Sequence, residues 1–92
     1  MDMIKLRLFS KLREIAAAKE VEVEGDDLSI KEALERFAQQ HGDEARAVLF
    51  DRSGELWPSV LLLVNGQAAS EKADTSLKPG DTVSVLLPTA GG

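Results

Sequence analysis

One segment of this sequence, residues 29–41, constrains the fold more than any other. Ser29 and Glu32 have the spacing of a capping box, in which each side chain accepts a hydrogen bond from the other residue's backbone N–H. Apolar positions then recur on one face of a helix at Ile30, Ala33, Leu34, Phe37, Ala38 and His41. Gly42 follows where many helices end in a left-handed residue. The chain therefore contains an amphipathic helix whose apolar stripe must pack on another layer.

Alternating apolar and polar residues predict the strands that form this second layer. Met3–Phe9 places Ile4, Leu6 and Leu8 on one face, and Val21 and Val23 alternate with glutamates in a second strand. Val60–Val64 is an apolar run that leads into Asn65-Gly66, a strong hairpin signal. The turn Lys78-Pro79-Gly80-Asp81 precedes a last strand, Thr82–Leu87, which Pro88 ends. These patterns predict two or three strands after the main helix.

Shorter elements complete the expected order. Ser10 can cap a helix over Lys11–Ala18, and Asp43–Leu49 can add one or two helical turns. Leu56-Trp57 is predicted to form a short edge strand, with Trp57 a packing residue. We therefore expect an α+β fold: a mixed four- to five-stranded sheet with one main helix packed on one face. Residues 1–87 would form the domain, and residues 88–92 a flexible Gly-Gly tail.

The composition and the absence of known motifs argue against several classes of function. The 92 residues carry a net charge of −5, which disfavours binding to nucleic acid. There is no cysteine, no apolar signal segment at the N-terminus and no apolar run of the ~20 residues that span a bilayer. No nucleophile–base pair, phosphate loop or convergent metal-ligand set is present. We expect a cytoplasmic protein that holds no metal and is not itself an enzyme.

The element order and three short stretches resemble the ubiquitin-like β-grasp sulfur-carrier family. The stretches are Leu8–Ala16, the segment from Gly54-Glu55-Leu56-Trp57 to Val64-Asn65-Gly66, and Val83–Gly92, which ends in Gly91-Gly92. The family includes the MoaD-like small subunit of molybdopterin synthase and the small archaeal modifier proteins. The sequence departs from the family where two prolines often follow the last strand, because Leu87 stands in the first position and only Pro88 is kept. Thr89-Ala90 also replaces the commoner Val-Thr or Val-Ser.

The resemblance implies that chemistry takes place at Gly92. A separate adenylating enzyme, similar to ubiquitin-activating enzymes, would use ATP to activate the carboxylate, and this chain would bind no cofactor stably. Sulfur attack would give a thiocarboxylate that donates sulfur in molybdopterin synthesis, with the large subunit of molybdopterin synthase as partner. In the alternative, the activated Gly92 is joined to lysines of target proteins. A third reading is a β-grasp scaffold that needs no Gly-Gly.

The residue types of the tail suit such a role. Gly91 and Gly92 lack a Cβ, so their backbone can approach an active site closely. Pro88 has a fixed φ, and Pro88, Thr89 and Ala90 could thread a narrow partner channel. From Pro88 to Gly92 an extended tail reaches ~16 Å, at roughly 3.3 Å per residue.

Strand alternation also predicts a docking surface beside the tail. If Val83, Val85 and Leu62 point inward, the intervening side chains point outward. The expected outward apolar patch consists of Phe9, Leu61, Leu63 and Leu86. Exposed apolar clusters commonly mark partner sites.

Overall fold

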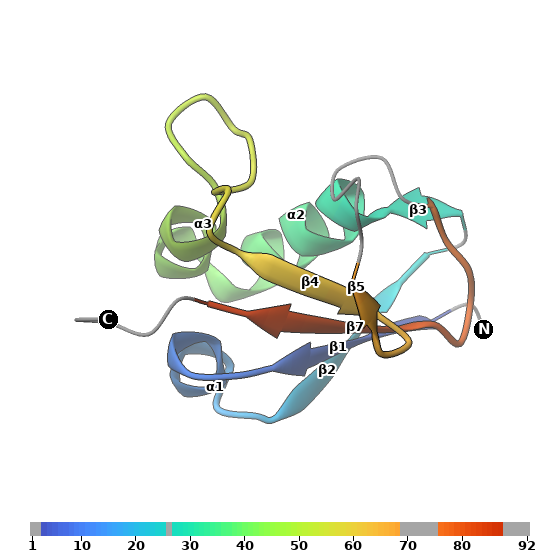
Figure 1. Cartoon of the computed structure of the whole chain (residues 1–92). Helices are drawn as coiled ribbons and strands as arrows, with labels where there is room; N and C mark the ends of the chain where they lie inside the picture. Colours follow the sequence, from blue (N-terminus) through green and yellow to red (C-terminus); the bar gives the residue numbers. More distant parts are fainter. Residues whose placement is uncertain (1–2, 26, 69–75, 88–92) are drawn as a thin grey trace.

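A five-stranded mixed sheet forms the centre of the fold (Figure 1). The computed structural model describes residues 3–25, 27–68 and 76–87. The strands lie in the order β2-β1-β7-β4-β5. Their bounds are Met3–Leu8 for β1, Glu20–Glu24 for β2, Leu61–Val64 for β4, Gln67–Ala68 for β5 and Thr82–Leu86 for β7. The sheet has the strand number and the mixed character that the sequence predicts.

The pairing places the last strand in the middle of the sheet. β1 and β2 are antiparallel, and the helix α1 (Lys11–Ala16) connects them. β7 runs parallel to β1, with Leu6 opposite Val83, and antiparallel to β4, with Leu62 opposite Val85. The left-handed residue Ala17 (φ 56°) ends α1 two residues before the predicted boundary.

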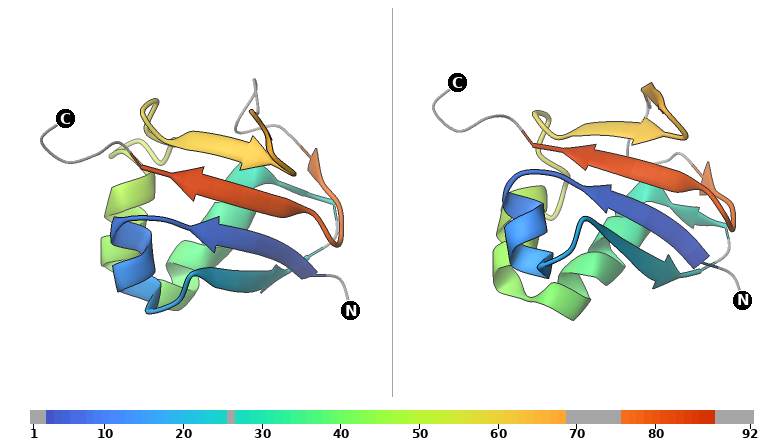
Figure 2. Two further views of the ribbon diagram at one scale, coloured as in Figure 1. Left: turned by 60° about the horizontal axis from the view of Figure 1, so that its bottom comes forward. Right: turned by 90° about the horizontal axis from the view of Figure 1, so that it is seen from below.

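Two further helices cover one face of the sheet, α2 (Ile30–His41) and α3 (Asp43–Leu49), as Figure 2 shows. The capping box of α2 is confirmed. The backbone N–H of Glu32 donates to Ser29 Oγ at 3.1 Å, and that of Ser29 donates to Glu32 Oε1 at 3.0 Å. Gly42 has a positive φ of 97°, but its ψ of −170° lies outside the left-handed helical region expected there.

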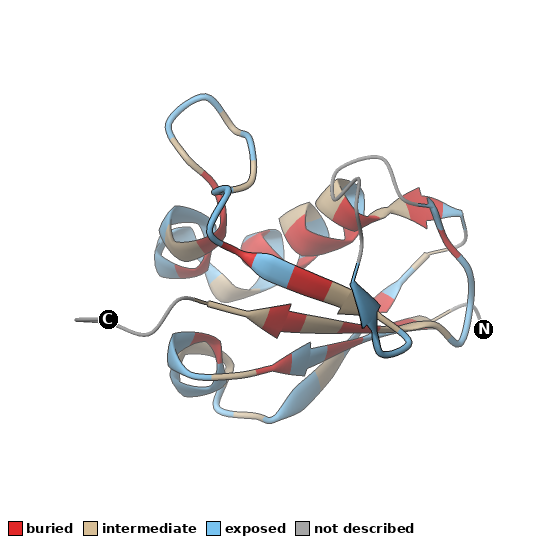
Figure 3. Ribbon diagram, viewed as in Figure 1, coloured by how far each residue is buried: buried red, intermediate tan, exposed pale blue. Residues whose placement is uncertain are grey.

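The core lies between the sheet and the helices (Figure 3). Inward residues of the three central strands alternate with outward ones, as expected from the sequence. These side chains and those from the α2 stripe are at most 1% exposed: Ile4, Leu6, Leu8, Leu62, Val83, Val85, Ile30, Ala33, Leu34, Phe37 and Ala38. Because one face of each strand is packed in this way, the opposite face is left for other contacts.

The structure adds a small second sheet that the sequence did not predict. β3 (Leu28–Ser29) pairs with β6 (Ser76–Leu77). Leu28 lies opposite Leu77 in this pair, and both residues are buried. Two-residue strands are too short to display a period of two. The prediction of two or three strands after the main helix is therefore wrong, since the described residues contain β4, β5, β6 and β7 there. The predicted strand at Leu56-Trp57 is a single bridge between Phe50 and Leu56.

The turns agree with the sequence-based predictions better than the short strands do. Asn65 (φ 52°) and Gly66 (φ 87°) join β4 to β5 with two positive φ angles, as a two-residue hairpin requires. A turn that contains Gly80 precedes β7. It is closed by a hydrogen bond from the N–H of Asp81 to the carbonyl of Lys78, at 3.0 Å. Asp81 also binds Asn65 through their side chains at 3.1 Å. The end of the β4–β7 pair where β4 ends and β7 begins is thus held in a defined register.

Candidate functional site

The strand β7 fixes the point from which the predicted tail leaves. β7 is the central strand, and Val83 and Val85 anchor it in the core with no exposed surface. Leu87, the next residue after the strand, is half-buried and packs against the core. The predicted tail residues Pro88, Thr89, Ala90, Gly91 and Gly92 lie outside the described residues. Their role, and the boundary of the domain at residue 87, therefore stay predictions.

Three members of the predicted patch lie together on the outer face of the sheet. Leu61 pairs directly with Leu86 across β4 and β7, and Leu63 is two residues further along β4 on the same face. Leu61 is 49% exposed, whereas Leu63 and Leu86 are half-buried. Leu61 is one of two large apolar side chains, with Trp57, that stand out as exposed in the described part of the chain.

Phe9 occupies the β1 side of this surface and is half-buried. Two guanidinium groups lie near its ring, with Cζ of Arg13 at 5.0 Å and Cζ of Arg7 at 5.9 Å from its centroid. Arg7 is an exposed outer-face residue, so this contact places the ring on the outer side. Arg13 is itself fixed, because its Nε donates to the Leu8 carbonyl at 2.8 Å. We call Phe9, Leu61, Leu63 and Leu86 the sheet patch.

The outer face becomes polar away from the sheet patch. Lys5 and Arg7 form ion pairs with Glu20 at 3.8 and 3.9 Å. Thr82 and Ser84 of β7 line the same shallow hollow as these three side chains. All three charged side chains are about half exposed, so these pairs add little stability. The outer face therefore combines an apolar end beside Leu87 with an end that carries paired charges and hydroxyl groups.

Two carboxylates among the described residues have a lowered pKa. Hydrogen bonds from the backbone N–H and the side chain of Ser29 lower the pKa of Glu32. The hydroxyl of Ser53 lowers the pKa of Asp51, and backbone N–H groups of the same loop add to the effect. Both carboxylates hold local backbone structure, one at a helix start and one in a loop. Within residues 3–25, 27–68 and 76–87, no group of three or more His, Cys, Asp or Glu could hold a metal ion.

One surface feature was missed in the sequence. The sequence predicts a packing role for Trp57, yet the residue is 41% exposed and lines a pocket with Leu87. Its Nε1 donates to the Ala47 carbonyl at 3.0 Å. The neighbouring Pro58 gave no indication of this exposure, which depends on how the 51–60 loop packs on α3. As for membranes, the part of the chain that the structure describes has no helix with the length and apolarity of a membrane span.

Known proteins and a family model align with this chain over nearly its whole length. The model of the ThiS family matches residues 6–92. Small archaeal modifier protein 1 of Haloferax volcanii is 31% identical over 87 residues, which cover 94% of this chain and 97% of that protein. A protein of Archaeoglobus fulgidus, named as a proposed sulfur carrier, is 29% identical over 91 residues, 97% of this chain and 98% of that one.

A solved structure agrees with these relatives. The crystal structure of the small archaeal modifier protein 1 from Haloferax volcanii superposes with a TM-score of 0.81 at 30% identity, covering 98% of this chain and 99% of that one. The expected ubiquitin-like β-grasp fold is thereby confirmed.

Proposed function

Because this chain belongs to the ThiS family of sulfur carriers and ubiquitin-like modifiers, we propose that it is a sulfur carrier that reacts through Gly92. The match that carries this proposal runs through Gly92 and includes the five residues that follow Leu87. Support from the fold comes from β7, which starts the tail at the centre of the sheet, beside the sheet patch.

The chemistry requires an activating partner. A carboxylate is a poor electrophile, so its oxygen first attacks the α-phosphorus of ATP and pyrophosphate leaves. Hydrosulfide then attacks the acyl-adenylate carbon, AMP leaves, and the S–H proton is lost. The product is a thiocarboxylate on Gly92, ready to donate sulfur. The adenylating enzyme supplies the ATP site and the catalytic groups, and this chain supplies the substrate carboxylate and a docking surface.

We assign the donated sulfur to molybdopterin synthesis, with the chain as the non-catalytic small subunit of the synthase. The large subunit would hold the pterin precursor and accept the tail. The relation that favours this assignment is the resemblance of Leu8–Ala16 to the small subunit of molybdopterin synthase. A fold match to a protein described as a molybdopterin converting factor subunit of Pyrococcus furiosus, at 24% identity, concerns the fold alone.

A second function, protein modification, is favoured by a specific observation. Two relatives at 31 and 32% identity are named small archaeal modifier proteins. In this reading, the amine of a target lysine attacks the acyl-adenylate in place of sulfur and forms an isopeptide bond. Both functions share the activation of Gly92, so they differ only in the nucleophile that follows.

The intact mass of the protein purified from its own cells, under neutral non-reducing conditions, separates the two functions. A carrier is expected to show one oxygen-to-sulfur exchange located on the terminal peptide. A modifier is expected to leave a Gly-Gly remnant on lysines of other proteins. A chain without Gly91-Gly92 that still complements a deletion strain would contradict both.

A further inference from the structure

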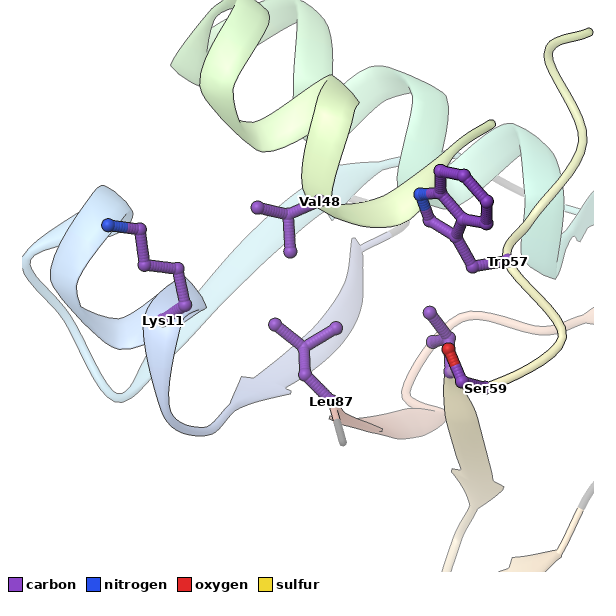
Figure 4. Close-up of a pocket in the computed structure, with 6 residues that line it drawn as sticks. Lys11, Val48, Trp57, Ser59 and Leu87 are labelled. Atoms are coloured by element: carbon purple, nitrogen blue, oxygen red, sulfur yellow. The ribbon is translucent and has the colours of Figure 1, made fainter. Parts of the chain in front are cut away.

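A groove beside the base of the tail has no role in the function described so far. It has a volume of about 290 Å³ and lies between α1, α3, the 51–60 loop and the end of β7. We call it the Trp57 groove, and its lining residues are Lys11, Val48, Trp57, Ser59, Val60 and Leu87. In Figure 4 the side chains of Val48 and Leu87 point toward each other across it, with Trp57 beside them. Apart from Lys11 and Ser59, its walls are apolar.

The aromatic wall of the groove is held rigidly although it is exposed. Trp57 donates its indole N–H to Ala47 at 3.0 Å and its backbone N–H to Leu49 at 3.1 Å, so α3 holds it at two points. An exposed tryptophan that is already ordered loses little conformational entropy when a partner covers it. Tryptophan is also among the residues enriched at the energetic centres of interfaces.

The loop that carries Trp57 is itself braced. Oδ1 of Asp51 accepts hydrogen bonds from the Ser53 N–H, the Ser53 hydroxyl and the Glu55 N–H at 2.8, 2.6 and 3.1 Å. The Glu55 carboxylate pairs with Lys31 of α2 at 3.3 Å. The groove is thus preformed, which is typical of a surface that binds a partner side chain.

Its position indicates which partner would cover it. Leu86 belongs to the sheet patch and Leu87 to the Trp57 groove, so consecutive residues at the base of the tail face two different apolar surfaces. The five residues after Leu87 span ~16 Å when fully extended. An enzyme that holds Gly92 in its active centre therefore brings the mouth of its channel against the groove.

We infer that the Trp57 groove is a second docking site for the enzyme that adenylates Gly92, and that it takes an apolar side chain from the rim of that enzyme's channel. The inference rests on the proposed function. The adenylating enzyme is the one partner that both the carrier and the modifier function require. Lys11 is paired with Glu44 at 3.3 Å at one end, so the groove presents an apolar floor rather than a free charge.

The test measures ATP–pyrophosphate exchange by the adenylating enzyme of the source organism, with the full chain as varied substrate. Trp57→Ala is expected to raise the KM for the chain about tenfold while kcat changes less than about twofold, because docking contributes equally to ground and transition states. Ser59→Phe fills the groove without removing a core contact, since Ser59 is exposed, and should raise KM similarly. Arg52→Phe adds the same ring to the same loop outside the groove and should leave KM unchanged.

The outcomes separate the inference from the proposed function. A wild-type KM for Ser59→Phe or for folded Trp57→Ala, or an equal rise for Arg52→Phe, would overturn the docking site. Thermal unfolding of each variant identifies any that do not fold, and Ser59→Phe decides the question if Trp57→Ala is one of them. If the chain lacking Gly91-Gly92 is still adenylated, the proposed function itself fails.

Discussion

Neighbouring residues of β4 have opposite roles although they are chemically identical. Leu62 has no exposed surface, whereas Leu61 is 49% exposed and faces Leu86 on the outer side of the sheet. The difference arises from the two-residue period of a strand, which sends successive side chains to opposite faces. An apolar residue that contributes little to the core but lies beside the end of β7 is better placed for binding than for stability.

Leucine-to-alanine changes at these two positions are therefore expected to differ. Leu62→Ala should lower the free energy of unfolding by about 2–5 kcal/mol through lost burial and a residual cavity. Leu61→Ala should lower it by less than about 1 kcal/mol, because half of the side chain is already in water. Urea unfolding measures both.

The binding measurement completes that comparison. Leu61→Ala should raise the KM of the adenylating enzyme for the chain, while Lys78→Ala, an exposed change away from the sheet patch, should not. A stable Leu61→Ala variant with an unchanged KM would remove Leu61 from the docking surface.

At the scale of elements, α2 is the helix whose start is determined most clearly by residues close to it in the sequence. Ser29 and Glu32 satisfy each other's backbone N–H groups before the first turn, and the apolar stripe then packs beneath the sheet. The Glu32 carboxylate accepts the Ser29 N–H, and its negative charge also lies at the positive end of the helix dipole. Both effects favour the ionised form.

The contribution of Glu32 to stability should depend on pH. Its folded-state pKa is lowered from the ordinary value of 4.5, chiefly by the hydrogen bond from the Ser29 N–H. A lowered pKa gives stability that is present above the unfolded pKa and is lost as the pH falls through the folded pKa. The stability difference between wild type and Glu32→Gln should thus be largest near neutral pH and shrink below pH 4.5.

Urea unfolding of both proteins across that pH range is the measurement. Ser29→Ala serves as the companion variant, with an expected loss of about 0.5–2 kcal/mol for the cap. A difference between wild type and Glu32→Gln that grows on acidification would contradict the assigned cause.

At the scale of the whole molecule, we expect the core and the reactive end to be separate. The described buried residues run from Ile4 to Val85, and Leu87, the last described residue, packs against them. The proposed function requires a stable body whose end can enter another protein. Stability and activity should then respond differently to changes after Leu87.

Deletion of Gly91-Gly92 tests that separation. We expect the thermal midpoint to stay within about 2 °C of wild type, because two glycines have no side chain to bury. Adenylation by the partner enzyme should be lost in the same variant. Differential scanning calorimetry and ATP–pyrophosphate exchange on one preparation measure both, and a large fall in the midpoint would mean that the last two residues pack against the body.

Local patterns were enough to predict the elements whose signals lie within a few residues. The alternation of Ile4, Leu6 and Leu8 assigns the faces of β1, and the capping box marks the start of α2. The positive φ angles of Asn65 and Gly66 are those that an Asn-Gly hairpin demands. Each of these features depends on backbone sterics or on hydrogen bonds between near neighbours, which the order of residues specifies directly.

Tertiary structure alone decided what depends on contacts between distant residues. The parallel pairing of β1 with β7 joins residues 5–8 to residues 82–85, and the β3–β6 pair joins Leu28 to Leu77. The exposure of Trp57 depends likewise on a loop resting on α3. No local period encodes such pairings, because their free energy comes from apolar surface that is buried only when the whole chain closes. The sequence by itself thus determined the locally encoded elements and the prediction of a reactive Gly-Gly, and the fold decided which apolar surfaces lie around the end of β7.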